Sequence, residues 1–212
     1  MPLRTFMPGI SIVTAKNLDD KNEAISLLGT PRNNSFFVHS LKVNDWIAVA
    51  VATRLPEISS VYDDKEGKIV LFDGYLTDIT IEVLKNYIDL EKPAWTVAML
   101  SKEMGDSAFL ALRGSYQFLI IDTNEKKLRF VIDRCGSRPA FYRCIGSNIA
   151  IAPTVAALAE IKPKLYNIDP KSFFEFVINA TFRNDHCIFP EVKKIMPGQV
   201  LSFNGKIQVK NY

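Results

Sequence analysis

The chain of 212 residues has little of what membrane and secreted proteins depend on. No apolar run approaches the roughly 18–20 residues that a membrane-spanning helix needs. The longest candidate, residues 46–53, has only the length of a β-strand. The N-terminus also lacks the basic, apolar and cleavage-site pattern of a signal peptide. We therefore expect a cytoplasmic protein that does not bind a membrane.

Cysteine and histidine are scarce. Cys135, Cys144 and Cys187 are odd in number and have no CxxC spacing, and His39 and His186 are the only histidines. This pattern argues against a disulfide framework and against a cysteine- or histidine-rich metal site. No glycine-rich phosphate loop is present, so the sequence shows no ATP site. We expect this chain to bind no cofactor and no metal.

Positive charge is not concentrated anywhere along the chain. The formal net charge is +3, and the lysine pairs 126–127 and 193–194 are isolated, so we do not expect nucleic-acid binding. A hydrophobic content of 48% with 23% charged residues is typical of a globular protein. The sequence has no internal repeat or linker. We expect residues 1–212 to form a single domain.

Short apolar segments predict a structure rich in strands. The predicted strands are residues 10–13, 47–52, 69–72, 116–121, 128–132 and 149–152. The run Ile47–Val51 is apolar on both faces, which is typical of a sheet covered on both sides. Polar residues 122–125 predict the turn of a hairpin, and Asn204-Gly205 predicts the turn of another over residues 199–209.

Helical spacing occurs between these strands, over residues 81–88, 97–104 and 155–161. Asp169-Pro170 predicts the start of a fourth helix. Its apolar positions are Phe173, Phe174, Val177 and Ile178, which we expect to form a buried face. The order of elements indicates an α+β domain with two packed antiparallel sheets flanked by helices.

Five short motifs follow one another in a fixed order over most of the chain. They are RLPEI at 54–58, DGY at 73–75, GSYQF at 114–118, DRCGSRPAFY at 133–142 and VKKIMPG at 192–198. In order and spacing they resemble the glutamine amidotransferase half of the asparagine synthetase family. The resemblance implies the four-layer αββα sandwich of N-terminal nucleophile hydrolases. The strongest matches are turns that need glycine and proline for their backbone.

The positions that carry glutaminase chemistry in that family differ in this chain. The family uses an N-terminal cysteine as nucleophile and its free α-amino group as base. The resemblance places Pro8 there, just before the first strand, with further residues upstream. Asp73 occupies the position of the asparagine that forms the oxyanion hole with the N–H of a glycine, here Gly74. Its carboxylate would repel a developing oxyanion.

The residues that would hold the substrate glutamine are also changed. By the resemblance, Tyr75 and a residue of 93–95 replace the two carboxylates that bind its amino group. Arg54 alone is retained, as the candidate for binding its carboxylate. We therefore expect a degenerate glutamine site with no catalytic residue.

The resemblance also implies a role. Family members with a degenerate first domain include β-lactam and carbapenam synthetases and lasso-peptide cyclases. In these a following synthetase domain adenylates a carboxylate with ATP and Mg²⁺, and an internal amine attacks. The implied role of this chain is structural: it packs against a synthetase domain, in the same or a partner chain, or forms a homodimer, and shapes the substrate pocket.

Two other functions stay open. The chain is an active glutaminase if processing exposes a new nucleophile, for example Thr5 or Ser11, or if the motif is misplaced. It is a free-standing regulatory or binding protein if no synthetase domain accompanies it. Removal of Met1 would also expose Pro2 as an N-terminal secondary amine, although nothing nearby supports its use as a base.

Other candidate clusters have a simpler structural interpretation. Cys135 lies between Arg134 and Arg138, which could lower its pKa, but a small turn residue is the favoured interpretation. The acidic residues of 63–66 could bind a cation, but a solvated loop is favoured, and residues 184–186 resemble a variable loop. We expect Cys144 and Cys187 to be packed.

Overall fold

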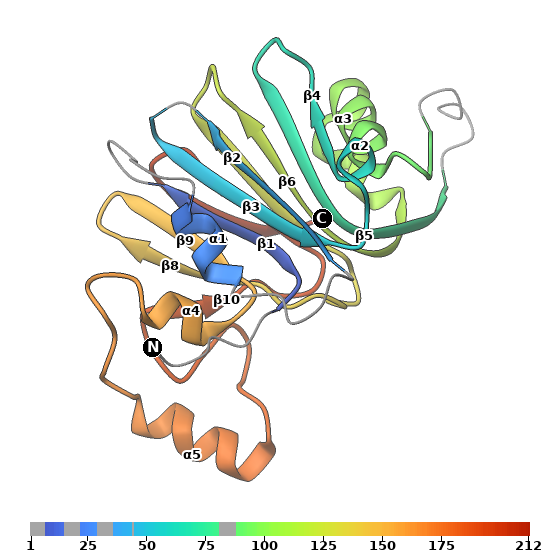
Figure 1. The fold of residues 1–212 in the computed structure, drawn as a ribbon. Helices are drawn as coiled ribbons and strands as arrows, with labels where there is room; N and C mark the ends of the chain where they lie inside the picture. The colour runs from blue at the N-terminus through green and yellow to red at the C-terminus, as the bar shows by residue number, and fades with distance from the viewer. Residues whose placement is uncertain (1–6, 15–21, 29–35, 44, 81–87) are drawn as a thin grey trace.

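The computed structural model describes residues 7–14, 22–28, 36–43, 45–80 and 88–212. Two antiparallel sheets of six strands pack face to face (Figure 1). Sheet A has the strand order β10 (Val192–Lys194), β8 (Phe141–Ile145), β9 (Asn148–Ala152), β1 (Gly9–Thr14), β3 (Ile47–Thr53), β2 (Phe37–Val43). Sheet B has the order β12 (Ile207–Asn211), β11 (Gln199–Phe203), β7 (Lys127–Ile132), β6 (Leu112–Asp122), β5 (Lys68–Ile79), β4 (Val61–Asp63).

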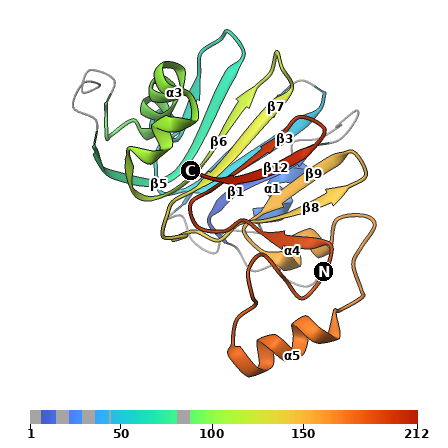
Figure 2. The same cartoon turned by 180° about the vertical axis from the view of Figure 1, so that it is seen from behind.

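Helices cover the outer face of each sheet. On sheet A lie α1 (Asn22–Leu28) and α4 (Val155–Ala159), and on sheet B lie α2 (Glu57–Ser60), α3 (Pro93–Met104) and the 3₁₀ helix η2 (Gly105–Leu110). The last helix, α5 (Pro170–Asn179), projects away from both sheets (Figures 1 and 2). The expected α+β sandwich with helices outside its two sheets is confirmed.

The alternation of side chains along the strands produces three apolar layers. β3 shows the pattern, since Ile47, Val49 and Val51 face sheet B while Ala48 and Ala50 face the helices of sheet A. A third cluster joins sheet B to α3 through Phe72, Phe118 and Leu100, among others. Because both faces of β3 are covered, all of its residues are buried, as its apolar run predicted.

Most predicted elements are present, with some changes in length. β5 extends the predicted strand 69–72 to Ile79, and α3 begins at Pro93 rather than at residue 97. The hairpins with turns after Asp122 and after Phe203 are confirmed. The sequence did not predict β2, β4, β8 or β10. The helix predicted over residues 81–88 falls almost entirely on residues 81–87, outside the described part of the chain.

Two burial predictions were wrong. Phe173, Phe174, Val177 and Ile178 of α5 are exposed, because this helix does not pack on either sheet. Cys144 is also exposed, whereas Cys187 is buried as expected, and burial raises its pKa to about 11.

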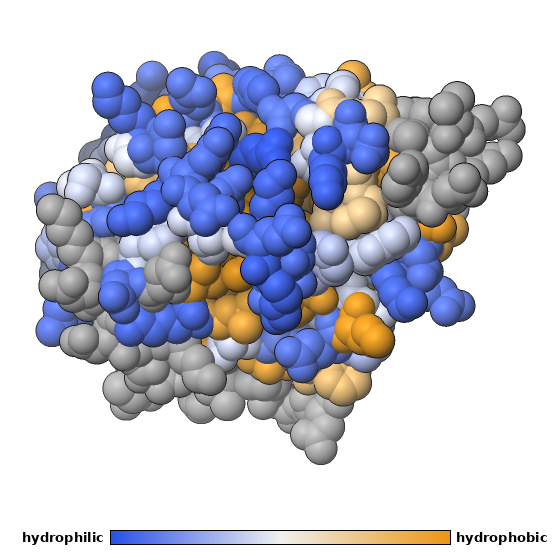
Figure 3. Space-filling model, turned by 90° about the horizontal axis from the view of Figure 1, so that it is seen from above, coloured by the Kyte–Doolittle hydropathy of each residue, from blue (hydrophilic) through white to orange (hydrophobic). Residues whose placement is uncertain are grey.

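The end of the sandwich that carries the β4–β5 and β6–β7 turns is mainly hydrophilic, with small apolar areas between polar side chains (Figure 3). None of the described helices has both the length and the apolar content to span a membrane.

Candidate functional site

The N-terminal end of β1 meets sheet B at the position where the resemblance places the glutamine site. Pro8 directly precedes β1, which begins at Gly9. A Cβ atom on Gly9 would lie 2.6 Å from Nε2 of Gln117, a residue of β6 in the opposite sheet. Gly9 therefore allows the start of β1 to approach β6, and Pro8 lies next to this contact.

Asp73 is the centre of the site. It pairs with Gln117 in the β5–β6 register, and its side chain is on the same face of β5 as the inner-core residue Leu71. Its Oδ2 accepts hydrogen bonds from Nη1 of Arg138 at 2.7 Å and from Nε2 of Gln117 at 3.2 Å. The Thr53 hydroxyl, at the end of β3, bonds to it as well. The cluster thus joins both sheets.

This carboxyl group is almost completely withdrawn from water, at 1% residue exposure. Burial raises the pKa of Asp73 above its ordinary value, and the neighbouring Arg138 guanidinium acts against this effect. Two polar atoms beside it, Oε1 of Gln117 and Nε of Arg138, are buried and have no hydrogen-bond partner among the described residues. The carboxylate of this ion pair is therefore inside the protein, while the Arg138 side chain is 26% exposed.

Gly74 lies where β5 and β6 approach most closely. Its φ angle is +122°, and a Cβ atom there would lie 2.1 Å from the carbonyl oxygen of Ser115 and 2.8 Å from the Cα atom of Tyr116. Only glycine fits this position. A backbone requirement explains Gly74 without any catalytic role.

The other residues predicted for glutamine binding point elsewhere. Tyr75 is 56% exposed, and Arg54 is exposed with its guanidinium 5.3 Å from the ring centre of Phe36. Residues 93–95 begin α3, where no side chain caps the helix and no carboxylate is present. The structure brings Asp73 and Gly74 beside the start of β1 but provides no carboxylate near Tyr75 from this segment.

Sequence reasoning missed the partners of Asp73. Gln117 and Arg138 both lie in matched motifs, GSYQF and DRCGSRPAFY, but the motifs identified them only as scaffold. A buried aspartate in an otherwise apolar strand is a signal that a basic partner is needed. The sequence alone did not indicate which arginine provides it.

The loop after β7 is organised by Asp133, which is buried. Its carboxylate accepts hydrogen bonds from the backbone N–H groups of Tyr116, Cys135 and Ser137, and from the Ser137 hydroxyl. Gly136 and Gly198 donate to its backbone carbonyl. These hydrogen bonds show that the DR-x-G motif stabilises a turn. The same turn positions Arg138 beside Asp73.

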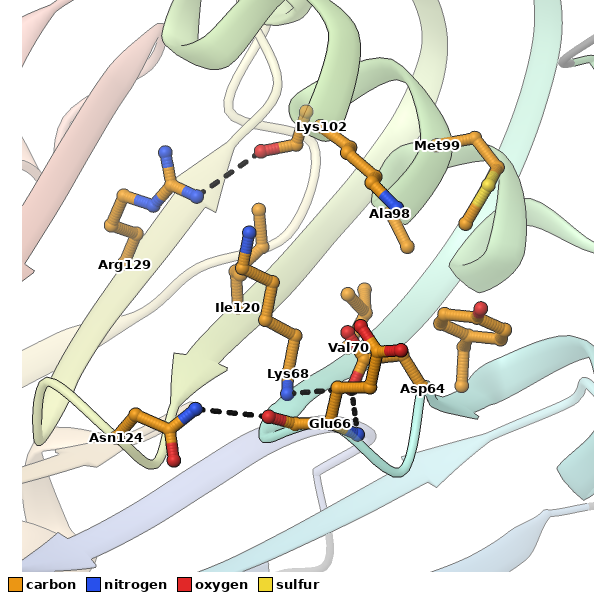
Figure 4. A pocket seen from close by; sticks show the side chains of 12 residues that line it. Asp64, Glu66, Lys68, Val70, Ala98, Met99, Lys102, Ile120, Asn124 and Arg129 are labelled. Atoms are coloured by element: carbon orange, nitrogen blue, oxygen red, sulfur yellow. Dashed lines mark hydrogen bonds between the residues drawn. The ribbon is translucent and has the colours of Figure 1, made fainter.

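A hollow of about 590 Å³ borders the site, lined in part by Tyr75, Ser115 and Ser137. A second hollow lies between α3 and the β4–β5 turn (Figure 4). There Asp64 accepts from the backbone N–H groups of Glu66 and Lys68, both at 2.8 Å. The acidic residues of this turn therefore stabilise a solvated loop, the interpretation that the sequence favoured.

The remaining candidate clusters have structural partners. Asp185 lies 3.7 Å from Nζ of Lys193, and its carbonyl oxygen accepts from the N–H of Lys194, which fastens the loop to β10. Cys135 is exposed in the turn after β7. In the described part of the chain no group of three or more His, Cys, Asp or Glu residues is arranged to hold a metal ion.

Two solved structures are similar to the chain over 97% of its length. One is a glutamine phosphoribosylpyrophosphate amidotransferase from B. subtilis, complexed with ADP and GMP, at a TM-score of 0.52 and 14% identity. The other is described as the allosteric regulatory enzyme of purine biosynthesis, at a TM-score of 0.53 and 14% identity. The chain spans only 43% of each of these longer chains. The likeness confirms the N-terminal nucleophile hydrolase type of fold.

A comparison with curated protein sequences gives no match. The family described as glutamine amidotransferase domain matches residues 93–212, more than half of the chain. This segment contains Gln117, Asp133 and Arg138 but begins after Tyr75. The chain therefore belongs to the glutamine amidotransferase domain family.

Proposed function

We propose that this chain is a catalytically degenerate glutamine amidotransferase-like domain. Its role is to support or shape the substrate pocket of an asparagine synthetase-like enzyme that forms amides with ATP. The observation that carries the proposal is the ion pair that the buried Asp73 forms with Arg138 beside the start of β1.

An amidotransferase needs a neutral hydrogen-bond donor where the tetrahedral intermediate develops its negative oxygen. Asp73 offers an acceptor at that position, and burial strengthens its repulsion of a second negative charge. The Nη1 atom of Arg138 is bound to Asp73 at 2.7 Å, so this donor is not free to bind a developing oxyanion. The ion pair therefore occupies this position, while Nε of Arg138 has no hydrogen-bond partner among the described residues.

The nucleophile position supports the same conclusion. Pro8 has no side-chain group that can attack a carbonyl, and within the chain its nitrogen is a tertiary amide with no proton or basic lone pair. Gly9 follows in close contact with Gln117. Neither part of the cysteine-and-amine machinery is present at the start of β1.

A degenerate first domain fits an amide-forming enzyme whose attacking amine belongs to the substrate. In such an enzyme ammonia from glutamine is not required, so the scaffold can persist without the glutaminase. The synthetase domain, in the same or a partner chain, would bind ATP and Mg²⁺ and adenylate the carboxylate. This chain would contribute the folded sandwich against which that domain packs.

The first experiment is to measure ammonia release from glutamine by the purified chain, with its N-terminus determined by intact mass. We expect no release above the buffer background. In a chain with the exposed Cys135 and Cys144 changed to serine, an electrophilic glutamine analogue should leave the mass unchanged, because Pro8 supplies no nucleophile at the start of β1. The Asp73→Asn variant is the matched control: it restores a neutral amide but no nucleophile, and should also release no ammonia.

Ammonia release by the unmodified chain, or a mass that shows a new Cys, Ser or Thr N-terminus together with turnover, would establish an active glutaminase instead. The synthetase role has a separate test in the native protein. We expect ATP to be converted to AMP and pyrophosphate during amide formation, at a rate that does not respond to glutamine. A native protein that consumes no ATP and binds another protein would be a regulatory module.

A further inference from the structure

Helix α5 presents its apolar side to solvent and its polar side to the protein. Phe173, Phe174, Val177 and Ile178 lie on one face and are between 44% and 78% exposed. On the opposite face Ser172 is buried and Glu175 is partly buried. An amphipathic helix at a protein surface normally has the reverse orientation. The outward apolar face therefore needs a partner.

The helix is well formed although it does not pack on a sheet. The Asp169 carboxylate caps its first turn by accepting from the N–H of Ser172 at 2.9 Å, and Ala180 ends it in the left-handed conformation. Phe176 stacks on Phe182 with ring centres 5.0 Å apart. These contacts hold α5 in place, so substitutions on its outward face should leave the core of the sandwich intact.

The exposed apolar area is large enough for a stable interface. We define the α5 face as the four outward residues together with two exposed apolar residues of the preceding segment: Tyr166, Ile168, Phe173, Phe174, Val177, Ile178. From typical aromatic areas this face offers on the order of 700 Å² per copy, close to the roughly 800 Å² that each partner contributes to a standard interface.

The charges at the ends of α5 favour a second copy in antiparallel orientation. The first turn contains Lys171, beside the positive end of the helix dipole, and the last turn contains no basic residue. In an antiparallel pair, Lys171 of each copy lies beside the negative C-terminal end of the other helix. A two-fold axis thus places a basic side chain beside each C-terminal end, which has none in its own last turn, and the same apolar residues meet each other across it.

We propose that α5 is the interface of a symmetric homodimer, in which two copies pair their α5 faces antiparallel. A lipid surface is the less favourable partner, because the polar side of the helix carries Ser172, Glu175 and Asn179 rather than a row of basic residues. This inference does not depend on the proposed function.

The test is sedimentation equilibrium of the purified chain over micromolar to several hundred micromolar concentrations. We expect a reversible species of twice the 23.9 kDa mass of the chain. The double variant Phe174→Asp/Ile178→Asp should weaken dimerisation at least about 100-fold, since each substitution removes an interface anchor. Ile58→Asp on α2 is the matched control, because Ile58 is equally apolar and 72% exposed but lies away from α5.

Circular dichroism should be the same for the double variant and the control, and their urea unfolding should agree at concentrations low enough for both to be monomeric. As a check on geometry, Phe174→Cys in a chain with Cys135 and Cys144 changed to serine should cross-link to itself on oxidation, and Ile58→Cys in the same background should not. A chain that stays monomeric throughout the concentration range overturns the proposal. So does a dimer that persists in the double variant, or a monomer that binds anionic vesicles through Phe174.

Discussion

At the scale of single residues, Asp73 and Gly74 are neighbours with different requirements. The Asp73 side chain points inward and needs the Arg138 charge and polar donors around it. Gly74, the next residue, lies so close to the β6 backbone that no side chain would fit there. Side chains alternate along a strand, so the two residues meet different surroundings. Both were singled out from the sequence as parts of a glutamine site, yet the structure gives each a structural reason to be there.

The steric requirement at Gly74 leads to a sharp prediction. Gly74→Ala should lower the free energy of unfolding by more than about 4 kcal/mol or prevent folding, because a Cβ atom meets backbone that cannot move aside. Gly146→Ala is the matched control, with φ of +60° and no atom within 4 Å of the added Cβ. It should cost about 1 kcal/mol. Urea unfolding of both variants measures the difference, and equal losses would contradict this explanation.

At the scale of elements, Asp106 connects the 3₁₀ helix η2 to sheet B through ion pairs. This residue of η2 accepts from Arg129 of β7 and lies 2.6 Å from Nζ of Lys210 of β12. Burial alone would raise the pKa of Asp106, but hydrogen bonds from Lys210 and Arg129 outweigh it and hold the pKa below the ordinary 3.8. The ionised form is therefore the one that stabilises the fold.

The stability that Asp106 contributes should depend on pH. Because its folded pKa lies below 3.8, the contribution is present above that value and is lost as pH falls through the folded pKa. Asp106→Asn should lower the free energy of unfolding by about 1–3 kcal/mol at pH 7. Urea unfolding measured down to pH 2 should show the two proteins converging. A difference that stays constant with pH would refute a role for the charge.

Helix α5 shows the limit of element prediction. Helical spacing identified correctly which residues share a face, and Asp169-Pro170 identified where the helix begins. Periodicity does not determine whether that face meets the protein or the solvent. That depends on the position of the helix relative to both sheets, which is a property of the tertiary structure (Figure 2).

At the scale of the whole molecule, the N-terminal part of the chain supplies the centres of both layers. β1 and β3 are interior strands of sheet A, and β5 pairs with the central strand β6 of sheet B. Residues 93–212, the segment that matches the family, contain none of these three strands. The family segment is therefore only part of one sandwich core.

A fragment of residues 93–212 should consequently fail to fold alone. Without β1 and β3, β9 keeps β8 but loses β1 on its other side, and β6 loses β5 along its whole length. We expect no cooperative urea transition and rapid proteolysis, compared with a single transition for residues 1–212. Addition of residues 1–92 as a separate chain is the informative control. Cooperative unfolding of the fragment by itself would show that the sandwich divides into independent parts.

The sequence by itself determined the features that depend on neighbouring residues. Apolar runs and polar turns predicted most strands and two hairpins, the Asp169 cap predicted a helix, and motif order predicted the sandwich. Only the tertiary structure decided that Asp73 meets Arg138, 65 positions later, and that the α5 face and Cys144 are exposed. The sequence patterns that predict turns and strands extend over only a few residues. The Asp73–Arg138 contact and the exposure of α5 depend instead on how two complete sheets pack, because this packing positions β5, the loop after β7 and the helices.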